Sequence, residues 1–132
     1  MDYLLDTCAV SDFVKGDQNT IDRLKLTPPL QIKISAITAY ELYYGLQKNP
    51  SIKESTKNAV LGFLNDIEII SFKRNEANNA AAIRAQLEKS STPIGAYDVL
   101  IAATATANNF VLVTSNEKEF RRIKELKIEN WR

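Results

Sequence analysis

Five side chains able to bind a cation follow predicted strands or lie in the first turn of predicted helices. Asp6 directly follows the apolar segment YLL, Glu41 lies in the first turn of the helix predicted after IKIS, and Asp98 opens an alanine-rich helix. Asn116 and Glu119 follow the segment FVLVTS. Oxygen ligands of this kind suit the hard cations Mg²⁺ and Mn²⁺. Such a site activates water and neutralises charge on a phosphate, so the pattern indicates phosphoryl-transfer chemistry.

The composition excludes several other kinds of catalytic site. The 132 residues include no histidine, which removes Ser-His-Asp and Cys-His catalysis and the paired-histidine route to RNA cleavage. A single cysteine cannot form an internal disulfide. Seventeen basic against sixteen acidic residues give a net charge of +1, so any contact with nucleic acid must be local. The start MDYLLD lacks the basic region of a signal peptide, and no apolar run approaches a membrane span, so we expect a cytoplasmic protein.

Segments typical of strands alternate with segments typical of helices. Strands are predicted at residues 3–5, 30–35, 67–72 and 110–115, with a fifth at 126–130. Helices are predicted at residues 9–16, 20–26, 38–49, 51–64, 75–89 and 98–107, with a helical turn at 117–123. Because the strands are apolar on both faces, we expect one α/β domain over residues 1–132, with a central parallel sheet of four to five strands and helices on both faces.

This fold predicts where the polar side chains meet. Ligands of open α/β sheets bind outside the carboxyl ends of the strands, near the point where the strand order reverses. We therefore expect Asp6, Asn116 and Glu119 at that edge, with Glu41 one helical turn further on.

Each of these residues also has a purely structural interpretation. Asp6 suits a helix N-cap, Thr38-x-x-Glu41 a capping box, Asp98 the helix macrodipole and Asn116-x-x-Glu119 a second cap pattern. Asp98 is the main objection to this interpretation. It opens a helix that carries no charge for nine further residues, in a part of the chain expected to be buried, where an unpaired carboxylate is costly. A bound metal ion would compensate that charge.

Four segments occur in an order that identifies a family. They are YLLDT, ISAITAYELYYGL, IGAYDVLIAATA and FVLVTSNEKEFRRIKELKIENW. The first resembles the opening strand and first aspartate of the PIN-domain family, and the second its I-[ST]-x-x-T-x-x-E-L-x-x-G helix. The third resembles the G-x-x-D-x-L-I-A-A block, and the fourth the closing segment. The likeness is closest to the VapC branch, the toxin ribonucleases of bacterial type II toxin–antitoxin pairs.

The resemblance implies a three-layer α/β/α PIN fold and a Mg²⁺-dependent endoribonuclease, with Mn²⁺ as a substitute ion. It implies a cellular RNA substrate, such as a structured tRNA or rRNA. It also implies a homodimer and a VapB-type antitoxin, with DNA contacted only indirectly through the antitoxin. Asp6, Glu41 and Asp98 match the family's acidic positions: Asp6 and Asp98 as direct metal ligands, and Glu41 as a direct or water-mediated ligand that helps to orient the nucleophile.

Two positions depart from the family pattern. Asn116 stands where many members have a fourth aspartate, and a neutral amide binds a divalent ion less strongly, although Glu119 one turn away supplies charge. Cys8 stands where Asn or Ser is more usual. We expect it to be a small buried hydrophobe rather than a redox or catalytic group.

The residues that contact RNA are less well defined. The basic residues Lys118, Arg121, Arg122 and Lys124 either contact RNA or form a solvated helix face with neighbouring glutamates, and the solvated face is favoured. The tyrosines Tyr40, Tyr43 and Tyr44 either stack on bases or pack in the core or an interface, and packing is favoured.

Two rival functions remain at this stage. A PIN-like nuclease that acts on DNA, or in RNA maturation, would share every catalytic residue. A non-catalytic binding module would instead tolerate the loss of the carboxylates.

Overall fold

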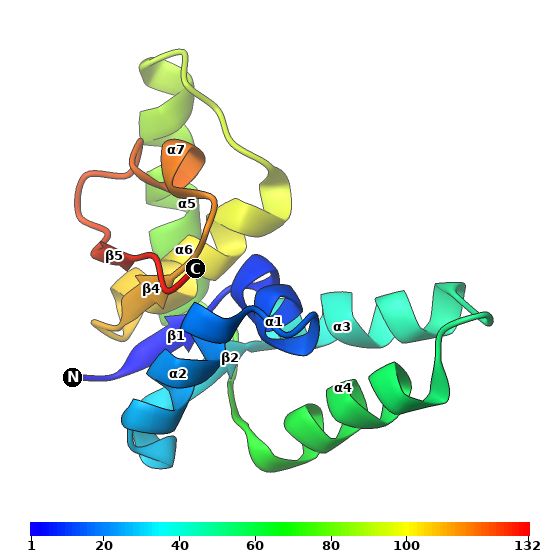
Figure 1. The fold of residues 1–132 in the computed structure, drawn as a ribbon. Helices are drawn as coiled ribbons and strands as arrows, with labels where there is room; N and C mark the ends of the chain where they lie inside the picture. The colour runs from blue at the N-terminus through cyan, green and yellow to red at the C-terminus, as the bar shows by residue number, and fades with distance from the viewer.

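The centre of the protein is a five-stranded, fully parallel sheet, seen in a computed structural model of residues 1–132 (Figure 1). The strands are β1 Tyr3–Leu5, β2 Ile32–Ser35, β3 Glu68–Ile70, β4 Val111–Val113 and β5 Ile128–Glu129. Their order across the sheet is β3-β2-β1-β4-β5, so the chain builds outwards from β1 to β3 and then continues on the other side of β1. The order therefore reverses between β1 and β4. The predicted α/β class and parallel sheet are confirmed.

Helices connect the strands and cover both faces of the sheet. They are α1 Thr7–Val14, α2 Gln18–Leu26, α3 Ala36–Lys48, α4 Glu54–Asp66, α5 Arg74–Lys89, α6 Ala96–Ala107 and α7 Glu117–Phe120, with a 3₁₀ turn η1 at Pro29–Gln31. In Figure 1, α5, α6 and α7 gather above the sheet, whereas α3 and α4 extend together to the right, next to α1. None of the helices combines the length and the apolar character needed to cross a membrane.

Four helices begin two residues earlier than predicted. The predicted first residues were 9, 20, 38 and 98, whereas α1 begins at Thr7, α2 at Gln18, α3 at Ala36 and α6 at Ala96. For α1 and α3 the reason is an N-cap at the strand end: Asp6 caps α1 and Ser35 caps α3, so each strand runs straight into its helix. Asp98 is consequently the third residue of α6 rather than its first.

Two hydrophobic clusters lie on opposite faces of the sheet. Leu4 and Leu112 pack with α5, α6 and α7, whereas Leu5 and Val113 pack with α1, α3 and α4. Successive residues of one strand thus enter different clusters, as the alternation of side chains along a strand requires. Both faces are buried, which explains why the strands are continuous apolar segments and fixes the position of the residues that follow them.

Candidate active site

Asp6 lies at the end of the central strand, where the strand order reverses. Its backbone N–H donates to the carbonyl of Val113 at 3.0 Å, so it sits against the end of β4. Its Oδ1 accepts a 2.8 Å hydrogen bond from the N–H of Ala9, and the residue is only 2% exposed. The predicted N-cap is confirmed.

Glu41 lies in the second turn of α3 and is held from α1. Its Oε1 accepts a 2.6 Å hydrogen bond from the hydroxyl of Thr7, which also lies 3.3 Å from the hydroxyl of Thr38. The predicted capping box of Thr38 and Glu41 is wrong. The helix begins at Ala36, and the Ser35 hydroxyl accepts from the N–H of Thr38 at 3.0 Å, so the Glu41 carboxylate is left for Thr7.

Asp98 is half-buried near the start of α6, a helix whose remaining length is largely buried, as predicted. Burial, together with the charges of Glu119 and Glu41, raises the pKa of Asp98 to about 6. Burial likewise raises the pKa of Asp6 to about 6, against the lowering effect of its hydrogen bonds and with a contribution from the charge of Asp98. These charge effects show that the carboxylates of Asp6, Glu41, Asp98 and Glu119 lie near one another at one edge of the sheet.

Asn116 and Glu119 contact each other in the turn after β4. The Asn116 Nδ2 donates to Glu119 Oε2 at 3.1 Å, and the Asn116 N–H donates to the Thr114 hydroxyl at 2.9 Å. The predicted cap pattern is not formed: Asn116 occupies the N-cap position of α7, but its side chain makes no capping hydrogen bond. The amide is instead directed to the carboxylate of Glu119.

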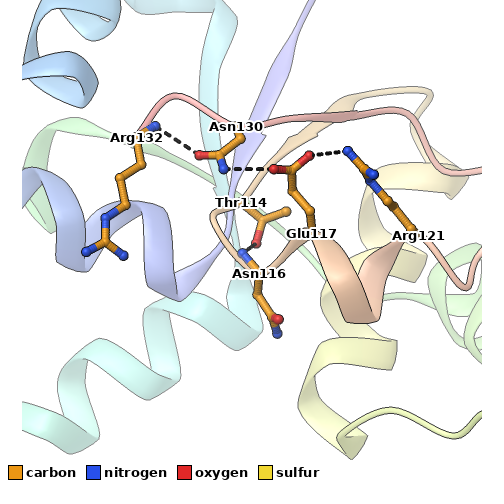
Figure 2. A network of polar contacts seen from close by, with 6 residues as sticks. All are labelled: Thr114, Asn116, Glu117, Arg121, Asn130 and Arg132. Carbon is orange, nitrogen blue, oxygen red and sulfur yellow. Dashed lines mark hydrogen bonds and ion pairs between the residues drawn. The ribbon is translucent and has the colours of Figure 1, made fainter.

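The C-terminal segment holds this turn in place. Glu117 accepts hydrogen bonds from Arg121 Nη2 at 2.7 Å and Asn130 Nδ2 at 2.9 Å, and Asn130 Oδ1 accepts from the N–H of Arg132 at 3.0 Å (Figure 2). The side chain of Asn116 points away from this network (Figure 2). Arg121 is therefore engaged with Glu117, as expected of a solvated helix face; contact of this face with RNA stays a prediction.

The acidic cluster, defined as Asp6, Glu41, Asp98 and Glu119, has no cationic partner in the chain. No lysine or arginine forms an ion pair with any of its members. In this structure no three acidic side chains converge to metal-binding geometry. One oxygen of Asp6 accepts a hydrogen bond from the N–H of Ala9, and one oxygen of Glu41 accepts from the hydroxyl of Thr7. Four carboxylates beside one amide nevertheless form an oxygen-rich donor set that suits a hard divalent cation.

One expectation about a neighbouring residue was wrong, and a second was wrong in part. Cys8 is exposed rather than buried; it is the second residue of α1, whose buried residues are Ala9 and Val10. Partial desolvation of its sulfur, with the charges of Asp6 and Asp98, raises the pKa of Cys8 to about 11, so the unreactive thiol form predominates at neutral pH. Tyr40, Tyr43 and Tyr44 do not pack in the core, since each is about half exposed. Packing of these tyrosines at an interface stays a prediction.

Two threonines that support the acidic cluster were missed in the sequence. Thr7 donates to Glu41, and the Thr114 hydroxyl lowers the pKa of Asp6 and accepts from the backbone of Asn116. The available signal was their position, because each follows a buried strand within two residues. A hydroxyl directly after a strand lies at the carboxyl edge of the sheet, where it can form hydrogen bonds with carboxylates at the same edge.

The clustered carboxylates predict a dependence of stability on pH and on divalent cations. Because the pKa of Asp6 and Asp98 is about 6 when folded, above the ordinary value of 3.8, the folded protein binds more protons than the unfolded chain between these pH values. Their contribution to stability is therefore present below pH 4 and lost as the pH rises through 6. We expect the metal-free melting temperature to be higher at pH 5 than at pH 8, and Mg²⁺ to raise it at pH 8.

Thermal melts at the two pH values, with and without Mg²⁺, measure this effect. The Asp98→Asn variant serves as the control, since its stability should depend less on pH and on Mg²⁺. A melting temperature that Mg²⁺ leaves unchanged at pH 8 would contradict a cation site in the acidic cluster.

Comparison with known proteins identifies relatives over nearly the whole chain. The family model described as PIN domain matches residues 3–126. The chain is 35% identical over 130 residues to the "tRNA(fMet)-specific endonuclease VapC" of Salmonella typhimurium, covering 98% of this chain and 97% of the relative. It is 38% identical over 133 residues to "Ribonuclease VapC2" of Rickettsia felis, covering 99% and 98%.

A solved structure agrees with these relatives. The crystal structure of VapBC2 from Rickettsia felis bound to a promoter DNA fragment contains a chain that superposes on this one with a TM-score of 0.89. The two chains are 36% identical, and the superposition covers all of both.

Proposed function

The chain belongs to the PIN-domain family, and from that premise we propose that it is a Mg²⁺-dependent endoribonuclease, the toxin of a type II toxin–antitoxin pair. Mn²⁺ is the expected substitute ion. The observation that supports this most strongly is the acidic cluster: four carboxylates from separate elements lie near one another at the carboxyl edge of a parallel sheet, and none has a cationic partner. No structural role of these residues requires four uncompensated charges in one place.

Each residue of the cluster has a role in the proposed reaction. Asp6 and Asp98 would hold the cation, with Glu41 as a direct or water-mediated ligand. Asn116 and Glu119 would contribute to a second cation position, where the neutral amide binds less strongly than the aspartate of many relatives. When bound, the cation neutralises charge on the scissile phosphate and lowers the pKa of water.

Glu41 would also orient the attacking water. The Thr7 hydroxyl holds Oε1 of Glu41 at 2.6 Å, which fixes the rotamer of this side chain. In the proposed reaction its other oxygen accepts a hydrogen bond from the water that attacks the phosphate in line. The products carry 5′-phosphate and 3′-hydroxyl ends.

The relatives indicate partners and a class of substrate. One is described as specific for tRNA(fMet), and another was crystallised as a toxin–antitoxin complex on promoter DNA. We propose by analogy that this chain acts in the cytoplasm on a structured RNA such as tRNA or rRNA, and forms a homodimer. A VapB-type antitoxin would inhibit it and supply the contact with DNA.

Incubation of the protein with end-labelled RNA and DNA of the same sequence, with Mg²⁺, tests the nucleic acid preference. The expected result is cleavage of RNA alone. Equal cleavage of DNA would overturn the ribonuclease assignment in favour of a general PIN-like nuclease, and cleavage of neither after removal of all antitoxin would favour the non-catalytic binding module.

A further inference from the structure

An exposed row of aromatic side chains adjoins the acidic cluster. It comprises Tyr97 at the start of α6, Tyr40 and Tyr44 on α3, and Lys48 at the end of α3; we refer to these four as the aromatic row. The three tyrosines are 49%, 50% and 54% exposed. Neither hydrophobic cluster includes them, so the packing of the chain does not account for their presence on the surface.

Contacts within the aromatic row fix the orientation of its rings. The rings of Tyr97 and Tyr40 meet edge to face with centroids 5.7 Å apart, and their hydroxyls lie 3.5 Å from each other. Tyr40 and Tyr44 are stacked with centroids 6.3 Å apart and planes 19° from parallel. Lys48 Nζ lies 5.4 Å from the centroid of the Tyr44 ring. The row is thus ordered before any ligand binds, which lowers the entropic cost of binding.

The aromatic row begins at the acidic cluster. Tyr97 directly precedes Asp98 on α6, and Tyr40 directly precedes Glu41 on α3. The pKa of Tyr40 is raised chiefly by its contact with Tyr97 and also by the charge of Glu41, as expected of neighbouring groups. Lys48, the cationic end of the row, lies on α3 about two helical turns from Tyr40.

We propose that the aromatic row stacks on unpaired bases next to the scissile phosphate and thereby positions the substrate strand for cleavage. The inference rests on the proposed ribonuclease function. Aromatic side chains stack on any base whose face is free, whereas bases inside a duplex are stacked on one another and hide their faces. Lys48 at the far end would pair with a backbone phosphate of the same strand.

The position of the row favours RNA over a second copy of the chain as its occupant. A protein surface laid across Tyr97 and Tyr40 would lie directly beside Asp98 and Glu41, the next residues in the chain, which the substrate phosphate must reach. The tyrosine hydroxyls and the Lys48 ammonium would also lose water in such an interface, whereas a nucleic acid strand leaves one side of the row in contact with solvent.

Leucine substitutions of the row test the proposal. Tyr40→Leu and Tyr97→Leu remove the ring and keep apolar bulk, whereas Tyr40→Phe and Tyr97→Phe keep the ring. Tyr43→Leu is the matched control, since Tyr43 is a 47% exposed tyrosine on the same helix and outside the row. Binding is measured with a fluorescein-labelled 12-nucleotide RNA, alone and annealed to its complement, with Ca²⁺ in place of Mg²⁺ and strand integrity checked on a gel.

The expected result is a preference of the parent protein for the single strand, and an affinity at least about five-fold weaker in each leucine variant. The phenylalanine variants and Tyr43→Leu should bind as the parent does. In cleavage of an RNA hairpin the leucine variants should raise KM more than they lower kcat. A 2-aminopurine placed beside the cleaved bond should lose fluorescence on binding the parent protein but not the leucine variants.

Other outcomes separate this proposal from the ribonuclease function. RNA cleavage that the leucine variants leave unchanged would overturn the role of the row and keep the ribonuclease. Ring-dependent binding of the single strand without any cleavage would keep the row and overturn the ribonuclease. Loss of self-association in the leucine variants, at unchanged RNA affinity, would identify the row as a dimer interface, and absence of binding by the parent protein would also overturn the proposal.

Discussion

Replacement of Asp98 with asparagine is expected to reduce RNA cleavage by about 10³-fold while the protein stays folded. The substitution keeps the size of the side chain and removes one of the charges proposed to hold the cation. A loss of about 4 kcal/mol of transition-state stabilisation corresponds to this factor, within the range that metal-ion catalysis supplies. The measurement is the single-turnover cleavage rate of a labelled RNA in saturating Mg²⁺.

A second readout distinguishes loss of chemistry from loss of fold in this variant. Burial and the charges of Glu119 and Glu41 disfavour the ionised form of Asp98, so removal of its charge should raise the melting temperature of the metal-free protein at pH 8. Asp66→Asn, at the exposed end of α4, is the matched control and should change neither rate nor stability. Growth arrest that Asp98→Asn leaves undiminished in cells would contradict the enzymatic account.

Replacement of Asp6 with asparagine is expected to reduce RNA cleavage by a similar factor, about 10³-fold. The substitution separates the two roles of this residue, helix N-cap and proposed cation ligand. Asparagine is as good an N-cap as aspartate, and its carbonyl oxygen can accept the same hydrogen bond from the N–H of Ala9. The helix start is thereby preserved, and only the charge is removed. Retention of cleavage by Asp6→Asn would show that the cap is the main role of this residue.

Asp6→Ala supplies the complementary case. Alanine removes both the charge and the cap, and leaves the Ala9 N–H at the start of α1 without its acceptor. We expect cleavage to be lost as in Asp6→Asn, with stability about 1 kcal/mol below that of the asparagine variant. Denaturant melts of the two metal-free variants at pH 8 measure the difference.

The fold and the place of the acidic cluster could be predicted because they follow from short-range rules. Apolar strand segments such as YLL must be buried on both faces, and the residue after each strand must lie at the carboxyl edge. This reasoning placed Asp6 and the turn after β4 correctly. This prediction requires only the order of the strand and helix segments along the chain.

The errors arose where two local rules competed. Both Ser35 and Thr38 suit an N-cap, and the choice depends on where β2 ends, which pairing of Ser35 with Ile70 in β3 determines. The contact of Thr7 with Glu41 could not be predicted either, because the two residues belong to different helices, which meet only in the folded chain. Cys8 lies inside α1 rather than before it, and the buried residues of this helix are Ala9 and Val10.

The expected packing of the tyrosines in the core was wrong for a different reason. An aromatic residue on a helix is usually packed in the core, and composition alone does not distinguish the buried face of α3 from its exposed face. Thr38 and Ala39 are the buried residues of this helix, so its tyrosines lie mainly outside the core. Small residues facing the sheet, rather than large ones, were the signal in the sequence.

The most direct test of the central claim is the chemistry of the RNA ends. The purified protein, freed of antitoxin, is incubated with cellular RNA in Mg²⁺ or in EDTA, and the new ends are mapped by sequencing with and without phosphatase and kinase treatment. The account predicts cleavage only with Mg²⁺, with 5′-phosphate and 3′-hydroxyl ends, and none with Asp98→Asn. Ends with 2′,3′-cyclic phosphate, or cleavage that persists in EDTA, would contradict it.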